Sequence, residues 1–498
     1  MGNSNTAPID RKRKLEEVEG ENSSDSSDSS PLHIPKKKRT KSTSKYIFQT
    51  LFINGENSDI TIKAIGKDWN LHKHYLCQCG YFNSMFNGKW LESELTEIEV
   101  DILDKNIDEK ALKIAFGSLY TDDIMVKPVE VVGVLASATF LQLEGLIQYC
   151  HTLMKESIST DIVVEYYEIA HQYGLMDIKK LSFDWLLHNL MSPTNFKLLK
   201  NISCELMIQL ISHPDLFVLQ VEMDVYSLLR KWIFLKNNPA WDGTCKELLV
   251  EVDNFFKKFY KEKKLCYLEC IEGKEYIPVF QHVRWQHVIN ENSALKAIKT
   301  ECVLPEYWLD PFYKHQWFYR LQSEQSIDKG PTAVDEELFY KECSRNGRVL
   351  LKRGEYCWRW VGYNYGVDLL LSYVNGMIII TRNCSNSASG SIGLQNTRNI
   401  MLRLTAVNLD KNGCVEKSKS TELTLLSLSR DEECVLLRVD TDQIFPLVII
   451  LNVLVYTPLP DYPNPELSIP TLLSIDHSDV AVQTIGLHES PSKSELQT

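Results

Sequence analysis

The hydrophobic pattern changes its period twice along this 498-residue chain, which divides it into parts of three kinds. In the first part, short alternating runs such as Ile60, Ile62 and Ala64 predict half-buried strands, with helical stripes between them. Helical spacing fills the middle of the chain, and strand-like runs separated by Gly, Asn and Asp fill the last part. The pattern predicts a multidomain chain with an α+β domain over 46–155, an all-α domain over 156–265, a mixed connecting region over 266–347 and a β-rich, sandwich-like C-terminal domain over 348–457.

Two short helices are predicted near the start of the α+β domain. The first covers Leu71 to Cys79 and is stopped by Gly80, and the second covers Tyr81 to Phe86. The apolar run from Val131 to Leu141 predicts a buried helix later in the same domain.

The most apolar run of the chain extends from Ile444 to Tyr456. It falls short of the roughly 20 residues that a helix needs to cross a bilayer, and Pro446 and Asn452 interrupt it. We therefore expect a buried pair of short strands here and no membrane-spanning segment.

Both ends of the chain differ in composition from the rest. Residues 1–45 hold ten basic and seven acidic residues and no aromatic residue, which predicts a disordered tail with too little apolar area to fold. Residues 458–498 are rich in proline and predict a loose tail. The first tail contains two basic clusters, Arg11, Lys12, Arg13, Lys14 and Lys36, Lys37, Lys38, Arg39. Such clusters suit the acidic grooves of nuclear import receptors. The alternative is that they are solvated runs of charge without a function.

The first six residues fit the M-G-x-x-x-[ST] pattern of N-myristoylation, with Gly2 as the acceptor and Thr6 as the last position. The pattern also arises by chance. One acyl chain binds membrane only marginally, and the neighbouring basic clusters would supply the second attraction to an anionic surface.

Composition and missing motifs exclude several classes of function. The net charge of −12 argues against direct nucleic-acid binding, which needs a basic surface. The odd number of cysteines, 13, without paired spacing, indicates free thiols in a reducing compartment. The chain lacks the phosphate-binding loops, the G-x-S-x-G elbow and the H-E-x-x-H motif. We expect no catalytic residue and no cofactor.

His72, His74, Cys77 and Cys79 carry the residue types that bind zinc. On one helix, however, residues two positions apart point away from each other, and no second Cys/His cluster is near in the sequence. We therefore expect no metal site.

Tyr356, Trp358 and Trp360 alternate with smaller or charged residues, so one strand face carries three large aromatic side chains. Two interpretations stay open. The face belongs to the core of a sandwich, or it is an exposed platform for a substrate, because Trp and Tyr are frequent binding anchors.

Residues 58–86 resemble the start of a BTB/POZ domain. Asp59 opening a strand, His72 in the following segment, Tyr81-Phe82 and Met85-Phe86 match the family pattern, and 116–124 and 131–150 resemble its later segments. The helical part resembles a BACK domain. Residues 41–60, QVEMDVY at 220–226 and YCWRW at 356–360, together with this order of domains, resemble the germ cell-less type of the BTB/POZ–BACK family. That resemblance extends from about residue 41 to 458, and the strand-rich end takes the place of kelch repeats.

This resemblance implies a homodimer through the BTB domain, and an adaptor that brings a protein substrate to cullin-3, not an enzyme. Trp90-Leu91-Glu92 occupies the place of the family's cullin-contacting motif, whereas Asp59, His72, Tyr81 and Phe82 would support the BTB fold and dimer. An alternative interpretation has Trp90 packed onto its own domain.

The resemblance adds an expected location and a biological role to what the tail suggests. It implies the nucleus, at the nuclear envelope or matrix, with envelope proteins as further partners, and a role in germ-cell development and spermatogenesis. The alternative function is a nuclear-envelope scaffold or transcriptional co-regulator without a ligase role.

Overall fold

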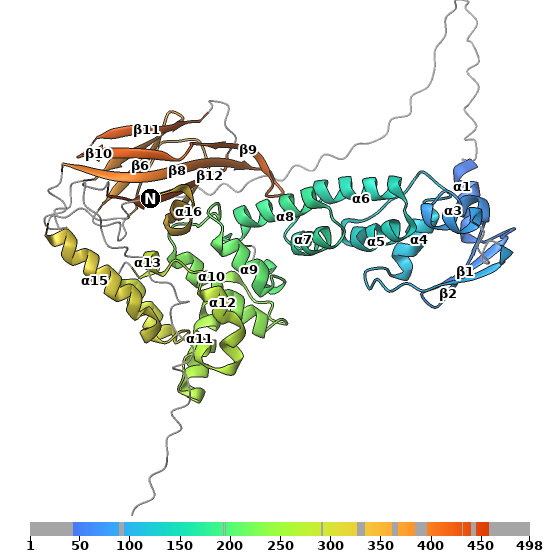
Figure 1. Cartoon of the computed structure of the whole chain (residues 1–498), viewed down its shortest axis with the longest axis horizontal. Coiled ribbons are helices and arrows are strands. Elements are labelled where there is room, and N and C mark those ends of the chain that lie inside the picture. The colour runs from blue at the N-terminus through green and yellow to red at the C-terminus, as the bar shows by residue number, and fades with distance from the viewer. Residues whose placement is uncertain are drawn as a thin grey trace, which may run out of the picture.

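The computed structural model describes residues 43–88, 94–192, 194, 196–289, 292–325, 334–360, 367–383, 396–430, 432–439 and 445–457. An α+β domain, a helical region and a β-sandwich follow one another, and the first and last lie at opposite ends of the molecule (Figure 1). This confirms the multidomain architecture predicted from the pattern. The predicted tails lie almost wholly outside the described residues; only Thr43 to Lys45 of the first are described, and they belong to a helix.

The first domain packs its helices around a three-stranded sheet of order β2-β1-β3. Strand β1 pairs antiparallel with β2 and parallel with β3. Ile60, Ile62 and Ala64 of β1 are buried, so the predicted alternation is confirmed. The elements are α1 (Thr43–Ile47), η1 (Phe48–Ile53), β1 (Ile60–Ala64), β2 (Lys67–Leu71), α2 (Lys73–Leu76), α3 (Gly80–Asn87), β3 (Glu97–Val100), α4 (Glu109–Gly117), η3 (Pro128–Glu130), α5 (Val131–Leu141) and α6 (Glu144–Glu156).

The helix predicted over Leu71–Cys79 is wrong in its extent. Leu71 ends strand β2, and the following helix α2 has a single turn, because the short apolar run fits the period of a strand as well as that of a helix. Gly80 does not stop a helix but begins α3, where any side chain would clash with Gln142 at the end of α5. The helices predicted over 81–86 and 131–141 are confirmed by α3 and α5.

The helical region continues the row of helices that starts with α5 and α6 (Figure 1). Tyr173, in the turn after α7, joins the helical region to the first domain, because its hydroxyl donates to Asp104 Oδ2 at 2.5 Å. The elements are α7 (Val163–Gln172), α8 (Met176–Asn189), η5 (Leu198–Lys200), α9 (Cys204–Ser212), α10 (Met223–Asn237), α11 (Cys245–Lys263), η6 (Tyr267–Glu269), η7 (Ile271–Tyr276), α12 (Ile277–Phe280), α13 (Trp285–Val288), α14 (Asn292–Glu301), η8 (Glu306–Leu309), α15 (Asp310–Glu324) and α16 (Glu336–Glu342). Among the helices in the described part of the chain, none combines the length and apolar character that a bilayer crossing requires.

The chain does not divide at residue 265, where the pattern predicted a domain boundary. Tyr267, Phe280 and Trp285 are each at most 1% exposed, and they lie in the same apolar core as Trp232 of α10. The region predicted as mixed is therefore helical up to α16 and completes the helical core. Its elements are too short, and its aromatic residues too closely spaced, for a helical period to be recognised.

The last part is a sandwich of two sheets, as predicted. One has the order β10-β8-β12-β4 with β9 also paired to β8, and the other has the order β11-β7-β6-β5. Strands β9 and β10 were not predicted, because the β9 side chains are all exposed and carry no apolar alternation. The strands are β4 (Ser344–Leu350), β5 (Tyr356–Trp360), β6 (Leu369–Val374), β7 (Met377–Arg382), β8 (Thr397–Leu409), β9 (Val415–Ser420), β10 (Thr424–Ser429), β11 (Glu433–Arg438) and β12 (Leu447–Val455).

The apolar run from Ile444 to Tyr456 contains one strand, β12, and not the predicted pair. All nine residues of β12 are buried. Ile449 and Leu451 face the core between the sheets, whereas Val448 and Ile450 face the helical core. Pro446 precedes the strand and Asn452 lies within it, where its amide Nδ2 donates to the Pro214 carbonyl at 2.9 Å. Burial on both faces therefore explains the continuous apolar run.

A buried ion pair joins the sandwich to the helical region. Arg345 of β4 donates from Nε and Nη2 to the two carboxylate oxygens of Glu222, at 2.7 and 2.9 Å. Its Nη1 donates to the carbonyls of Ile211 and His213 at 2.6 and 3.0 Å. The two charged side chains are 0% and 1% exposed. The helical region and the sandwich are therefore packed as one body.

Candidate functional site

Helix α3 leads directly into the predicted cullin-contacting segment. Phe82 on this helix is fully buried, and its ring stacks on Phe86 and lies near Phe116 of α4. Tyr81 is half-buried and packs on Phe140 of α5. These contacts place both residues in the support of the BTB-like fold and fix the direction in which α3 ends.

Trp90, Leu91 and Glu92 lie outside the described residues, between α3 and β3. Gly88 follows α3 with φ −81° and ψ 168°, an extended conformation open to any residue. The left-handed freedom of glycine is therefore not needed at this position.

His72 is held in place by hydrogen bonds at both ring nitrogens. Nε2 lies 3.0 Å from the Glu56 carbonyl, and Nδ1 lies 3.1 Å from the Tyr120 hydroxyl. Because a carbonyl only accepts, Nε2 carries the proton and Nδ1 accepts from Tyr120. Burial raises the pKa of the Tyr120 hydroxyl, which keeps its proton available for this bond. The arrangement is structural and leaves no nitrogen of His72 for chemistry.

Replacing Tyr120 by Phe is expected to lower the free energy of unfolding by about 1–3 kcal/mol, because the Nδ1 of His72 and its backbone N–H both lose their partner. Denaturant unfolding of the full chain measures the change. Tyr46→Phe is the matched control, since Tyr46 is 66% exposed. Equal stability of the two variants would contradict the structural role assigned to His72 and Tyr120.

Asp59 caps the start of α2, since its carboxylate Oδ1 accepts from the Lys73 backbone N–H at 2.8 Å. Its side chain is exposed. Asp59 supports the fold through this hydrogen bond, because the first N–H groups of a helix have no partner within the helix.

The four residues considered for zinc do not come together as ligands. His72 is engaged as described, His74 is exposed, and Cys79 is buried at the start of α3, where burial raises the pKa of its thiol. Within the described residues, no three His, Cys, Asp or Glu side chains are placed to share a metal ion.

The proposed aromatic platform is not an exposed surface. Trp358 is 7% exposed and lies in the core between the two sheets, with Tyr356 packed against that core. The side chain of Trp360 lies outside the described residues. The burial of Trp358, with Tyr356 partly buried against the same core, therefore favours the sandwich-core interpretation.

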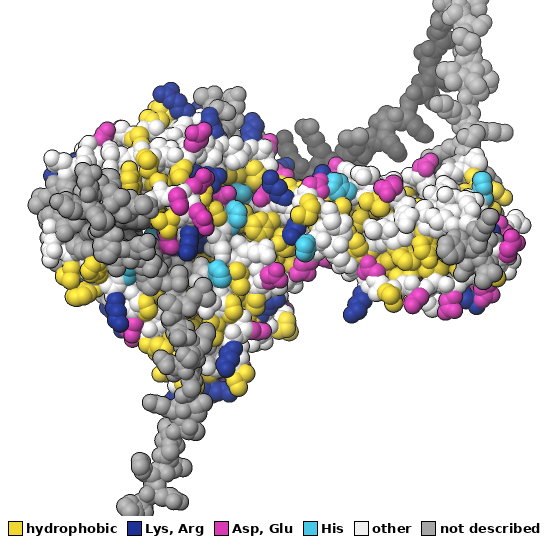
Figure 2. Space-filling view, in the orientation of Figure 1, with side chains coloured by type: hydrophobic (Ala, Val, Ile, Leu, Met, Phe, Trp, Pro, Cys, Tyr) yellow, Lys and Arg dark blue, Asp and Glu magenta, His cyan; other side chains and the backbone are white. Residues whose placement is uncertain are grey.

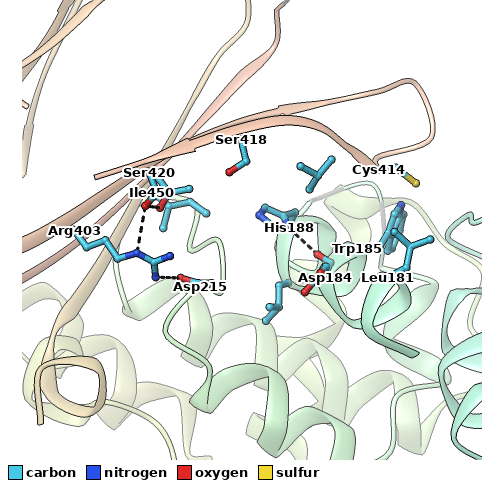
Figure 3. A pocket seen from close by; sticks show the side chains of 13 residues that line it. Leu181, Asp184, Trp185, His188, Asp215, Arg403, Cys414, Ser418, Ser420 and Ile450 are labelled. Atoms are coloured by element: carbon cyan, nitrogen blue, oxygen red, sulfur yellow. Dashed lines mark hydrogen bonds and ion pairs between the residues drawn. The ribbon is translucent and has the colours of Figure 1, made fainter. Parts of the chain in front are cut away.

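A pocket that the sequence did not reveal lies where α8 meets strands β8 and β9. It encloses about 280 Å³. Helix α8 contributes Leu181, Asp184 and Trp185 to its wall, and the strands contribute Arg403 and Ser418 (Figure 3). These residues are separated by more than two hundred positions in the chain, so no local motif announces them.

The turn between β8 and β9 is fastened to α8 beside this pocket. Trp185 Nε1 donates to the Asn412 carbonyl at 2.7 Å, and Asn189 Nδ2 donates to the Gly413 carbonyl at 2.8 Å. Gly413 has φ +82°, and a Cβ there would meet both side chains of α8. A left-handed glycine is therefore what allows the turn to approach the helix so closely.

The first domain also exposes apolar side chains, which gather on the face seen in Figure 2. Monomeric proteins seldom expose large contiguous apolar areas, and such areas are typical of protein interfaces. Among the described residues of this domain, the large exposed apolar side chains are Tyr46, Ile53, Ile65, Leu95, Leu103, Met125, Val129 and Tyr149.

Comparison with known proteins agrees with this architecture. The family model of the BTB/POZ domain matches residues 48–158. Germ cell-less protein-like 1 of Homo sapiens is 47% identical over 430 residues, which cover 86% of this chain and 84% of the relative. Germ cell-less protein-like 2 of Homo sapiens is 46% identical over 430 residues. Protein germ cell-less of Drosophila melanogaster is 35% identical over 450 residues, covering 85% of this chain and 79% of the relative.

The fold of the first domain and the family match define a BTB/POZ protein, a class built on a domain that mediates homodimerisation and protein interactions. The similarity extends through the helical region and most of the sandwich. The chain belongs to the germ cell-less family.

Proposed function

We propose that the chain is the substrate-binding adaptor of a cullin-3 ubiquitin ligase, dimeric through its BTB domain, and that it acts in germ-cell development and spermatogenesis. The observation that carries the proposal is the BTB/POZ domain in a member of the germ cell-less family. BTB domains commonly serve as cullin-3 adaptors, and the domain is of a non-catalytic, protein-binding kind.

The arrangement of the domains supports the adaptor role. The BTB domain and the sandwich lie at opposite ends of the molecule, joined by the row of helices that includes α7 and α8, whereas α9 to α13 lie beside the sandwich (Figure 1). An adaptor needs two binding surfaces held apart at a fixed separation. The buried pair of Arg345 and Glu222 holds the sandwich rigidly on the helices.

The cullin contact in this proposal is the segment Trp90-Leu91-Glu92, which follows α3. The described part of α3 is firmly packed through Phe82, so a segment at its end has a fixed starting point. An exposed Trp is able to fill an apolar pocket of a partner, and such an anchor carries about 2 kcal/mol or more of binding. Glu92 would accept hydrogen bonds from donors beside that pocket.

Replacing Trp90 and Glu92 together by Ala is expected to abolish cullin-3 binding while thermal stability and dimerisation change little. Purified full-length chain and cullin-3 are titrated by calorimetry, and light scattering gives the mass of the dimer. Trp317→Ala is the matched control, because Trp317 is 64% exposed and belongs to α15, far from the first domain along the chain.

Two results would count against this assignment. A stable double variant that binds cullin-3 with wild-type affinity would remove the contact from this segment. A variant that loses stability by the 3–5 kcal/mol typical of a truncated core aromatic would place Trp90 inside its own domain. If the wild type itself fails to bind cullin-3, the scaffold or co-regulator function replaces the adaptor.

The location of the protein is a proposal on sequence grounds. Gly2 and the two basic clusters, 11–14 and 36–39, lie outside the described residues. We propose that the clusters bind a nuclear import receptor and that acylation of Gly2, with the clusters, favours the nuclear envelope. Mass spectrometry of the N-terminal peptide tests the acylation directly.

A further inference from the structure

The pocket between α8 and the β8–β9 strands is lined by both apolar and polar side chains. Its apolar lining includes Leu181 and Trp185 of α8 and Ile450 of β12. Figure 3 shows that Asp184 of α8 and Ser418 of β9 lie on opposite sides of the space. Binding pockets are often found at such junctions between domains, with few polar groups placed in an apolar lining.

Asp184 is the charged group of this pocket that lacks a partner of its own. Its side chain is half-buried, and no hydrogen bond or ion pair of its carboxylate is found among the described residues. Burial raises the pKa of this carboxyl, although Lys180 and His188 oppose the shift. A partly desolvated carboxylate is stabilised by a cationic donor, which the chain does not bring into contact with it.

The nearby guanidinium does not meet this need. Arg403 donates from Nη1 to Asp215 Oδ1 at 2.5 Å and stacks near the Tyr340 ring, at 5.7 Å from its centroid. Arg403 is therefore committed to Asp215, on the far side of the pocket from Asp184 (Figure 3). Lys180, His188 and His213 act on Asp184 at a distance, so its carboxylate is open to direct contact with a cationic ligand.

Strand β9 borders the pocket as an open edge of the sheet. Within the described residues, β9 pairs with β8 alone. Thr421 N–H donates to the Leu404 carbonyl at 2.8 Å, one position beyond the pair of Thr405 with Ser420. Hydrogen-bonded pairs alternate in an antiparallel ladder, so the backbone groups of Ser418 and Ser420 point away from β8, to the open edge.

The side chains of β9 alternate in the same way. Ser418 and Ser420 line the pocket, so Lys417 and Lys419 lie on the opposite face of the strand, where both are exposed. A strand added beside β9 would place every second side chain over the pocket and the others on the face of the two lysines. Charge complementarity with Asp184 therefore favours a basic residue among the side chains that lie over the pocket.

We propose that this pocket and the edge of β9 bind an extended segment of a partner protein, which adds a strand to β9 and inserts a Lys or Arg side chain toward Asp184. Main-chain pairing supplies affinity in this mode, and the pocket supplies specificity. The inference rests on the proposed function, because it gives the adaptor its substrate site. Peptide binding is measured without cullin-3, so the two proposals can fail independently.

Lysines on an edge strand also protect against accidental pairing with other chains, and this is the competing explanation for β9. Protection alone makes no use of Asp184. A dependence of binding on the Asp184 carboxylate therefore separates the two explanations.

The test selects ligands from a phage library of random peptides about nine residues long, the length of a strand. The full chain is the bait, and enriched peptides are titrated with a fluorescent label against the wild type and its variants. We expect a Lys or Arg at one fixed position, and Asp184→Asn to weaken binding by about 10-fold or more. Ser418→Pro, which removes an outward N–H, should also weaken binding.

Asp242→Asn is the matched control, because it removes an exposed carboxylate of the helical region outside the pocket. Its affinity should equal that of the wild type, and thermal unfolding checks that Asp184→Asn is folded. Failure to enrich any peptide, or equal binding by wild type and Asp184→Asn, would overturn the proposal. Peptide binding without cullin-3 binding would retain this site and reject the adaptor function, and the reverse result would do the opposite.

Discussion

Replacing Glu222 by Gln is expected to lower the free energy of unfolding by about 3–5 kcal/mol, because the guanidinium of Arg345 would stay buried without its counter-charge. Burial opposes ionisation of Glu222, but Arg345 outweighs it and the pKa of this carboxyl is lowered. The pair is thus charged at neutral pH. Denaturant unfolding followed by tryptophan fluorescence measures the loss, since Trp232 and Trp285 are fully buried in the helical core.

An exposed pair serves as the control. Lys299 Nζ lies 2.6 Å from Glu306 Oε1 with both side chains 52% exposed, so Glu306→Gln should change stability by less than about 1 kcal/mol. In a double-mutant cycle, Glu222→Leu with Arg345→Met should lose less than the sum of the single variants, because neither charge is then left alone. If Glu222→Gln unfolds at the same denaturant concentration as Glu306→Gln, the Arg345–Glu222 pair does not hold the sandwich on the helical region.

A chain that ends at Leu265 is expected to fold only in its first domain. It would lack Tyr267, Phe280 and Trp285, which complete the core of the helical region, and the strand that brings Arg345 to Glu222. Full burial of one such aromatic contributes about 1.5–3 kcal/mol, and a whole domain is stable by only about 5–15 kcal/mol. The remaining helices therefore lose a large share of their net stability.

Limited proteolysis distinguishes the outcomes. The chain ending at 265 should be digested back to the BTB/POZ domain, near residue 158, whereas a chain ending at 457 should resist cleavage across the helical region. The comparison controls for loss of the C-terminal residues beyond the sandwich. A protease-resistant fragment that extends to residue 265 would mean that the helices fold without the segment that follows.

Helices and strands with a long, regular hydrophobic pattern could be predicted from the sequence, whereas those with a short or mixed pattern could not. The helix over 131–141 and the strand of Ile60, Ile62 and Ala64 have enough periodic residues to be assigned. Leu71 and its neighbours fit two periods, and only pairing with Ile60 decides for a strand. Strand β9 has six exposed residues and no hydrophobic signal at all, so its place depends on β8.

The candidate sites also differ in how far the sequence alone could predict them. The BTB-like residues Phe82 and His72 were found because they lie in one contiguous stretch that resembles a family. The alternation of aromatic residues around Trp358 fitted a core and an exposed surface equally well, and burial of Trp358 between the two sheets favours the core. Asp184 and Ser418 come together only through the fastening of the β8–β9 turn onto α8, which no local pattern encodes.

Strand β12 also limits how this protein can diversify. One face of the strand belongs to the core between the sheets and the other to the helical core. Alternate positions along the strand are therefore constrained by two different cores, and no face of it is free to change. Recombination that exchanged the sandwich for another terminal domain would leave an open apolar surface on the helices. The helices and the sheet that covers them are therefore expected to be inherited together, and change is better tolerated in the loops.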